Sequence, residues 1–245
     1  MLRLAVKYRD PAWITRSQNG WVHRYRDGYI LTEKLSGAPL RILRENTSNV
    51  FFHHYMPQPG DVVVELGAEY GTETLFLSRA VGPSGRVISV EAHPRTFAAL
   101  REVVARNRLG NVTAVHAAVT DSVGTTTITD GSALSNAVGA GDLEVPATTL
   151  RELLNSNSVG KVDLLKVNIE GSEGPLLSAL SLEDACRIKE AIVSCHDFRA
   201  DRGDGEWFRT GETVDEHLDR LGFKWTRRED HPQPWVKHYR YASRI

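Results

Sequence analysis

The chain has 245 residues, 41% of them hydrophobic, and a formal net charge of −1 at pH 7. This length allows one large α/β domain with a full core, with or without a small extension. The near-neutral charge predicts no nucleic-acid partner, and no apolar run has the length of a membrane span or a signal peptide. Two cysteines, Cys186 and Cys195, have neither metal-binding nor redox spacing, so we expect reduced thiols in a cytoplasmic protein.

The first 58 residues do not share the strand–helix pattern of the rest of the chain. Residues 21–25 and 29–33 flank an Arg-Asp-Gly turn, which predicts a hairpin. A short helix is expected over residues 46–55, before a proline-rich stretch. This N-terminal extension, residues 1–58, either caps a substrate or covers the edge of the sheet, and the sequence leaves both open. Residues 59–245 form the predicted main domain.

The main domain begins with the sequence VVVELGAEYG at residues 62–71. Three branched apolar residues predict a buried strand, two glycines a turn, and the residues from Thr72 a helix. A strand, a glycine-rich turn and a helix N-terminus form a nucleotide-type cradle at the edge of a parallel sheet. A second predicted strand, residues 86–91, ends at Glu91, whose spacing from Gly71 suits a carboxylate that accepts both hydroxyls of a ribose.

The turn itself indicates which ribose ligand binds. A dinucleotide fingerprint needs a middle glycine so that the backbone can approach a pyrophosphate, but Glu69 occupies that position and Glu65 lies just upstream. Two carboxylates repel a pyrophosphate. They suit a positively charged ligand that has a ribose and no phosphate, such as S-adenosylmethionine.

The remaining elements alternate between strand and helix. In chain order we expect a helix from Pro94 to about Gly110, a strand at 112–119, and an arm of 125–129 paired with 143–146 around a loop at 130–142. A helix at 149–154, a strand at 162–167, a helix after 171–175 and a strand at 191–195 follow. The chain then has a polar loop at 199–211, a helix that starts from a capping box at Thr213, and an antiparallel pair at 223–227 and 235–241. This order predicts a doubly wound α/β sheet with right-handed crossovers and a hairpin at its end.

Polar residues follow most of the predicted strands at the point where each strand ends. Ligands of such sheets gather at these carboxyl ends. The polar residues there are Glu65, Glu91, Thr120, Asp121, Asn168, Glu170, His196 and Asp197.

Four stretches together resemble the FkbM-type S-adenosylmethionine-dependent methyltransferases. They are PGDVVVELGA at 59–68, VEAHP at 90–94, AAVTD at 117–121 and VDLLKVNIEGSE at 162–173. The resemblance covers about residues 57–195 and implies a class I methyltransferase fold. That fold is a Rossmann-like, doubly wound, seven-stranded sheet whose last strand is antiparallel. The resemblance also implies methyl transfer, usually to a hydroxyl of a sugar or natural product.

The resemblance also implies the cofactor-binding residues by position. They are Glu65, Gly67, Ala68, Glu69, Tyr70 and Gly71 around the methionine part, Glu91 on the ribose, Ala92 and His93 against the adenine, and Ala118 to Asp121 at its edge. Glu69 replaces the usual Asn of the family, which alters the cofactor loop. Asn168 replaces the usual Asp, which weakens any metal site, so we expect no tightly held metal ion.

A hydroxyl acceptor needs a base that removes its proton. His196 follows the fifth strand of the main domain, and an ordinary histidine pKa of about 6.5 suits that role at neutral pH. Glu170 is the second candidate, and Asn168 completes the predicted catalytic set. Lys166 lies within the fourth strand, where it is either buried and paired or reaches the pocket.

The sequence therefore predicts an S-adenosylmethionine-dependent O-methyltransferase that acts on a small molecule with a hydroxyl, in natural-product biosynthesis. Two alternatives remain: a non-catalytic cofactor-binding or regulatory protein, and a dinucleotide-dependent oxidoreductase. The sequence indicates neither the acceptor nor the oligomeric state.

Overall fold

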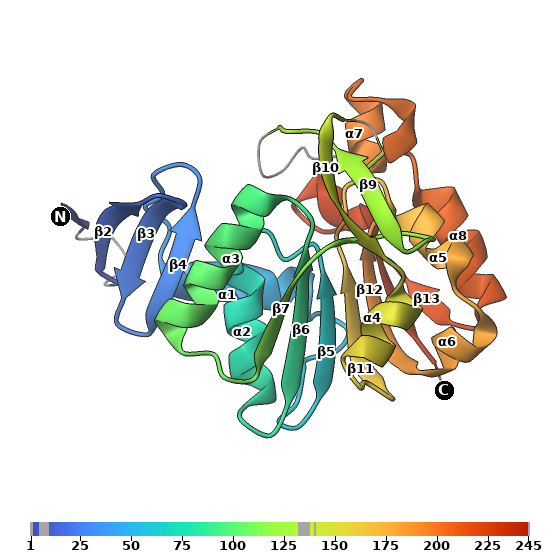
Figure 1. The fold of residues 1–245 in the computed structure, drawn as a ribbon, viewed down its shortest axis with the longest axis horizontal. Coiled ribbons are helices and arrows are strands. Elements are labelled where there is room, and N and C mark those ends of the chain that lie inside the picture. The colour runs from blue at the N-terminus through green and yellow to red at the C-terminus, as the bar shows by residue number, and fades with distance from the viewer. Residues whose placement is uncertain (1, 5–9, 132–137, 140, 245) are drawn as a thin grey trace.

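A seven-stranded sheet runs through the main body of the molecule in this computed structural model, which describes residues 2–4, 10–131, 138–139 and 141–244 (Figure 1). The strands lie in the order β13 (Lys224–Thr226), β14 (Tyr239–Ser243), β12 (Ile188–Ser194), β11 (Val162–Val167), β5 (Val62–Leu66), β6 (Arg86–Glu91) and β7 (Val112–His116). β14 runs antiparallel to both of its neighbours, β12 and β13, and the other six strands all run in one direction. The predicted seven-stranded class I arrangement is therefore confirmed.

Helices cover both faces of this sheet. On one face lie α1 (Leu40–Val50), α2 (Thr72–Val81) and α3 (Pro94–Asn107); on the other lie α4 (Leu150–Ser156), α5 (Glu173–Ala179) and α8 (Gly211–Arg220), with short α6 (Leu182–Cys186) beside them. The faces separate because side chains alternate along a strand: Val63 of β5 packs with α1 and α2, whereas Val64 packs with α4, α5 and α8.

A second, smaller sheet forms most of the N-terminal extension. Its antiparallel strands are β1 (Leu2–Leu4), β2 (Ala12–Ser17), β3 (Gly20–Tyr25) and β4 (Gly28–Thr32), and the last two form the predicted hairpin. Val22 and Leu31 pack against Tyr70 and α3, while Ile14 and Ile30 pack against α1 and α2. The small sheet therefore lies on the helices beside the main sheet (Figure 1). None of its described residues lines the pocket at the strand ends.

A third sheet forms the predicted arm. It consists of β8 (Ala118–Val119), β10 (Leu143–Thr148) and β9 (Gly124–Ile128), and β9 pairs with β10 as expected. The predicted strand at 112–119 is broken at Ala117, because the chain leaves the main sheet there and β8 joins β10 instead. Residues 132–137 and 140 of the predicted loop lie outside the described residues.

Four predicted boundaries are wrong for identifiable reasons. The helix expected at 46–55 is α1, which begins earlier, at Leu40, because the extended Pro39 before it is the N-cap residue. The expected polar loop at 199–211 contains α7 (Asp197–Asp201) and a 3₁₀ turn, η1 (Glu206–Phe208). No capping box forms at Thr213, because α8 already begins at Gly211, whose N–H donates to the Asp197 carboxylate. Another 3₁₀ turn, η2 (Pro234–His238), delays β14.

Candidate active site

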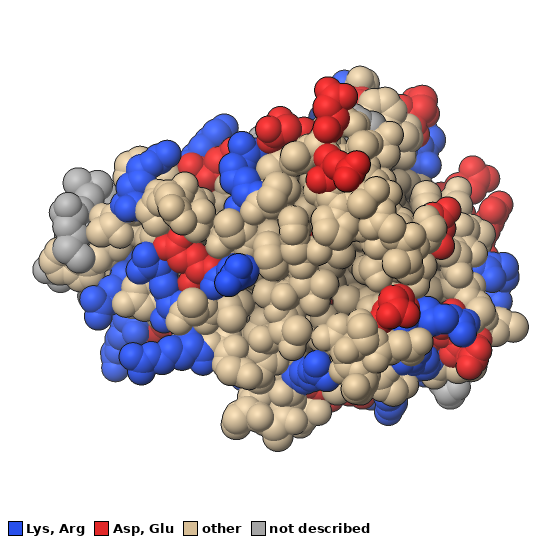
Figure 2. Space-filling model, in the orientation of Figure 1, with Lys and Arg blue, Asp and Glu red and all other residues tan. Residues whose placement is uncertain are grey.

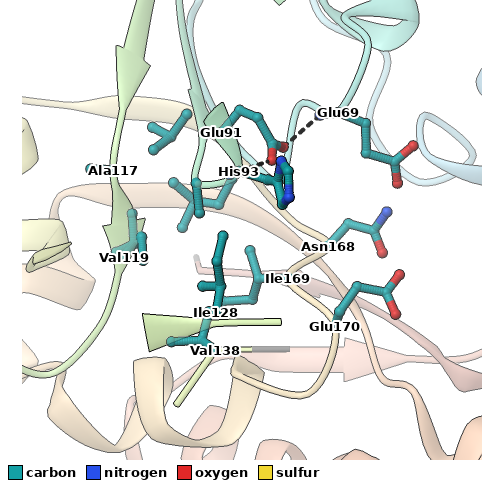
Figure 3. Close-up of a pocket in the computed structure, with 15 residues that line it drawn as sticks. Glu69, Glu91, His93, Ala117, Val119, Ile128, Val138, Asn168, Ile169 and Glu170 are labelled. Carbon is teal, nitrogen blue, oxygen red and sulfur yellow. Dashed lines mark hydrogen bonds between the residues drawn. The ribbon is translucent and has the colours of Figure 1, made fainter. Parts of the chain in front are cut away.

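A pocket opens at the carboxyl ends of β5, β6 and β11, where the arm reaches over them (Figure 3). Figure 3 shows the side chains of Glu69, Asn168 and Glu170 pointing to one side, away from the apolar residues. The pocket therefore has an apolar half and a polar half. Its lining residues are Leu66, Gly67, Glu69, Val90, Glu91, Ala92, His93, Ala117, Ala118, Val119, Ile128, Val138, Asn168, Ile169 and Glu170.

The turn after β5 forms the floor of the pocket. Gly67 has φ of +77°, and a Cβ built on it would lie 1.9 Å from the carbonyl oxygen of Asn168, so only glycine allows these two backbones to touch. The N–H groups of Gly67 and Ala68 both donate to the Val90 carbonyl, at 3.0 Å. Glu69 also has a positive φ, of +48°, where Asn is better tolerated than Glu. This turn is consequently held against both neighbouring strands.

The Glu91 carboxylate organises the same turn. One oxygen accepts the N–H of Glu69 at 2.8 Å, and the other accepts the N–H of His93 at 2.9 Å and the hydroxyl of Thr96 at 2.7 Å. A carboxylate offers about four acceptor positions. About one position thus remains for a ribose hydroxyl, so the expected acceptance of both hydroxyls requires this network to rearrange.

The structure brings only part of the predicted site together. Of the predicted residues, Gly67, Glu69, Glu91, Ala92, His93, Ala118, Asn168 and Glu170 line the pocket, whereas Glu65, Ala68, Tyr70, Gly71, Asp121 and His196 do not. Tyr70 packs against the small sheet, and Asp121 lies at a separate hollow beside α4. Ile128 and Val138 also line the pocket, and the sequence does not predict this, because only the folded arm brings them there. The β-rich pattern of the arm is the one signal of it in the sequence.

Glu65 and Lys166 form a buried ion pair behind the turn. The register of β5 and β11 places them side by side, and both side chains are almost completely inaccessible. The Lys166 ammonium lies 3.3 Å from the Glu65 carboxylate and donates to the Gly67 carbonyl at 3.1 Å. Burial lowers the pKa of Lys166, but the Glu65, Glu73 and Glu69 carboxylates outweigh it and raise that pKa. Lys166 is therefore charged, buried and paired, and it supports the turn after β5 from behind.

Glu69 has the most unusual carboxylate in the pocket. Burial raises the pKa of Glu69 to about 8, the Glu73 carboxylate adds to the shift, and the Lys166 ammonium opposes it. At neutral pH this group is largely protonated. A carboxylate of such basicity can exchange a proton near physiological pH.

His196 is held between two carboxylates. Its Nδ1 lies 2.9 Å from Glu173 and its Nε2 lies 3.3 Å from Glu170. Burial would lower the pKa of His196, but the two carboxylates outweigh it and raise that pKa to about 10. The structure does not favour His196 as the predicted base, because the ring lies outside the pocket lining and a carboxylate engages each of its nitrogens. Asp197 does not orient this ring either, because it accepts the N–H of Gly211.

Glu170 lines the pocket as an ionised group. Its carboxylate receives a 2.6 Å hydrogen bond from Arg199 and lies beside His196. Burial would raise the pKa of Glu170, but the bonds from His196 and Arg199 outweigh it and lower that pKa. A carboxylate stabilised in this way is a poor base. Glu170 and Glu173 together face the two ring nitrogens of His196.

Within the described part of the chain, no group of three or more His, Cys, Asp and Glu side chains is arranged to hold an ion. Among the same residues, no helix is long and apolar enough to cross a membrane.

Comparison with known proteins agrees with this architecture. The human transmembrane O-methyltransferase is 32% identical over 92 residues, a match that covers 31% of this chain and 32% of that protein, so this chain matches about a third of the length of its curated relatives. Among solved structures, an FkbM methyltransferase from Methylobacillus flagellatus superposes with a TM-score of 0.52 at 14% identity, over 83% of this chain and 57% of that one.

Fibrillarin from Aeropyrum pernix, solved with natively bound S-adenosyl-L-methionine, has a TM-score of 0.50 at 15% identity, over 94% of this chain and 97% of that one. At such identities the structural neighbours show the fold alone. The family model of the methyltransferase FkbM domain matches residues 65–225. With its class I sheet and its pocket at the strand ends, the chain belongs to the FkbM family of S-adenosylmethionine-dependent methyltransferases.

Proposed function

We propose that this chain transfers a methyl group from S-adenosylmethionine to a hydroxyl of a small molecule such as a sugar or natural product. The observation that carries the proposal is the division of the pocket into an apolar half and a carboxylate half, joined at the Gly67 turn. The curated relatives named as O-methyltransferases support the oxygen acceptor.

The residues present fit this cofactor. Ala117, Val119 and Ile128 provide an apolar surface for an adenine, and Glu91 retains an acceptor position for the ribose. The ionised Glu170 carboxylate provides negative charge for a cationic ligand on the polar side, and Glu69 adds to it once it has lost its proton. When bound, S-adenosylmethionine supplies an electrophilic methyl group on a sulfonium.

The remaining chemistry is removal of the acceptor proton. We propose Glu69 as the residue that accepts it, because its pKa of about 8 makes it the strongest base among the pocket carboxylates whose pKa is shifted. The ionised Glu170, anchored by Arg199, keeps the polar side negative. Asn168 lies between the two and can bind the acceptor through its amide.

Cofactor binding is tested by replacing Glu91. The E91A variant should bind S-adenosylhomocysteine more weakly by roughly 1–3 kcal/mol, because a ribose hydroxyl loses its acceptor and the Glu69 turn loses a hydrogen-bond partner. Isothermal titration calorimetry measures this change. D121A is the matched control, since Asp121 lies outside the pocket and its loss should leave affinity unchanged. Equal affinity in E91A and wild type would contradict the assignment.

Methyl transfer is tested with labelled S-adenosylmethionine against a panel of glycosides and sugar nucleotides. We expect acceptor-dependent transfer to oxygen, identified by mass spectrometry of the product. Tight cofactor binding without transfer to any hydroxyl compound would instead favour the non-catalytic alternative.

A further inference from the structure

Positive charge is concentrated in the N-terminal extension. Residues 1–58 contain nine Lys and Arg against four Asp and Glu, a net charge of +5, which leaves −6 for residues 59–245. Figure 2 shows many of the blue side chains gathered over the small sheet. The overall charge of −1 is therefore the sum of two parts with net charges of opposite sign. A near-neutral chain can still carry a local field that attracts a polyanion.

Aromatic and cationic side chains form a row across the small sheet. In the strand register Trp13 of β2 lies opposite Arg24 of β3, and Arg24 lies opposite Tyr29 of β4, so the three share one face. Trp13 is 41% exposed. The guanidinium groups of Arg24 and Arg106 lie 5.8 and 5.9 Å from the centre of the Tyr29 ring. This row presents flat rings beside positive charge.

Two adjoining hollows extend this row into a groove. The first is lined by Trp13, Tyr29 and four arginines, and the second by four arginines near α1; Arg26 and Arg79 line both. We call this surface the arginine groove, and its cations are Arg24, Arg26, Arg41, Arg44, Arg79 and Arg106. Two carboxylates also line it, those of Asp10 and Asp27. Two of its cations are paired outside the lining, Arg41 with Glu45 at 2.6 Å and Arg106 with Glu102 at 2.7 Å, so Arg24, Arg26, Arg44 and Arg79 carry most of the positive field.

The central cation of the groove is held in place. Arg79 donates to the Asp27 carbonyl, and a Cβ on Gly28 would lie 2.7 Å from the Arg79 guanidinium, so glycine at the turn lets the guanidinium approach the backbone. Burial lowers the pKa of Arg79, and nearby Arg44 lowers it further against the effect of Asp27. Two neighbouring guanidinium groups repel each other. An anion bound between them would remove that repulsion.

We propose that the arginine groove binds single-stranded nucleic acid, with phosphates on its arginines and bases stacked on Trp13 and Tyr29. A positive groove lined with aromatic rings, here the exposed Trp13 and the half-buried Tyr29, is the combination that binds single strands without sequence preference. An acidic peptide would use the arginines but gain little from the rings. The groove lies at the Arg79 end of α2, whereas the cofactor pocket lies at the opposite end of the same helix. The proposal therefore does not depend on the methyl-transfer reaction.

The test uses the full chain and two fluorescein-labelled oligomers, a uridine 12-mer and a thymidine 12-mer, followed by fluorescence anisotropy. We expect both to bind at 50 mM salt and to bind more weakly at 200 mM. Loss of two arginines in R26Q/R44Q should flatten the slope of log affinity against log salt by about 1.4, at about 0.7 per phosphate contact. The charge-matched control K224Q/K237Q, on exposed lysines of β13 and η2, should keep the wild-type slope.

The aromatic part of the proposal is tested at Trp13. W13A should weaken oligomer binding about 5- to 100-fold, and W13F, which keeps a stacking ring, should restore most of the affinity. Thermal melts check that both variants are folded. Absence of binding by wild type at 50 mM salt would overturn the proposal. Equal competition by inorganic polyphosphate, with W13A unaffected, would also overturn it, because the groove would then bind phosphate alone.

Discussion

Glu69 combines two unfavourable features at one position, a left-handed backbone and a carboxylate whose pKa is raised to about 8. Because that pKa lies above the unfolded value, folding is penalised as pH rises from about 4.5 through 8. E69Q should therefore raise the melting temperature at pH 9 and leave it nearly unchanged at pH 4, where the carboxyl is protonated in both states. Differential scanning calorimetry at the two pH values measures this effect.

The same variant tests the proposed base. In wild type kcat/KM should rise with pH through about 8 as Glu69 loses its proton, and E69Q should remove this limb and lower kcat roughly 10²- to 10⁴-fold. E69N is the matched variant, because Asn suits the positive φ and also lacks the carboxylate. A normal pH profile in both variants would remove Glu69 from the mechanism.

His196 is a buried cation between two carboxylates. Its loss would leave Glu170 and Glu173 without their shared positive partner. H196Q should cost roughly 3–5 kcal/mol of unfolding free energy at pH 7, because Glu173 and Glu170 lose their shared partner. The pKa of His196 is raised from 6.5 to about 10, so its contribution is complete below pH 6.5 and is lost as pH rises through 10. Urea unfolding at pH 6 and pH 10 measures both effects.

The double variant H196Q/E173Q is the control, and it should recover part of the lost stability because one orphaned charge is removed. Full stability of H196Q together with loss of methyl transfer would restore the predicted base role.

At the scale of single residues, the sequence identifies positions better than roles. Glu91 and Gly67 were found because their spacing from the glycine-rich turn is local. The partners of His196 could not be predicted, because Glu170 and Glu173 reach it only through the packing of β11, α5 and β12. A titrating group cannot be assigned without its neighbours in space.

At the scale of elements, the contact between the Gly67 turn and the end of β11 is the most demanding in the pocket. G67A should destabilise the fold by about 1–3 kcal/mol through backbone strain and by about 1–3 kcal/mol more through overlap with Asn168. The control is G82A, which also has a positive φ but open space around it, and should show the first cost only. Chemical denaturation measures the difference between the two variants.

Elements with strong apolar patterns were predictable from the sequence. The strands at 62–66, 86–91 and 162–167 appear as expected because each is a buried run of branched residues. The segment 199–211 is predicted as a loop but contains the end of α7 and η1. Ion pairs such as Arg199 with Asp204 and Arg209 with Asp201 stabilise these elements. Hydrophobic periodicity carries no information about such pairs.

At the scale of the whole molecule, the boundary predicted at residue 58 separates α1 from the sheet it covers. Val50 packs with Val63 and Leu77, and the Tyr241 hydroxyl donates to the Val50 carbonyl at 2.7 Å. We propose that the main domain begins near Pro39, at the start of α1.

Two shortened chains test this boundary. A chain that starts at Pro39 should fold with a lowered melting temperature, because the small sheet no longer covers the side chains of Leu75 and Phe76. A chain that starts at Pro59 should lack a cooperative transition in near-ultraviolet circular dichroism, since the apolar surface under α1 is then open to water. Wild-type-like melting of that shorter chain would place the boundary back at residue 58.

The antiparallel strand β14 lies between β12 and β13, although it is synthesised after both. In the nascent chain, the backbone groups of Ile192 and Val193 that later pair with β14 remain unpaired at the edge of the sheet. They stay so until the segment from Tyr239 has been synthesised. β13 has no partner in the sheet before then. Such edges attract other unpaired strands. Nascent chains that stall before residue 239 should therefore be prone to aggregation. All residues that line the pocket at the strand ends have been synthesised by then.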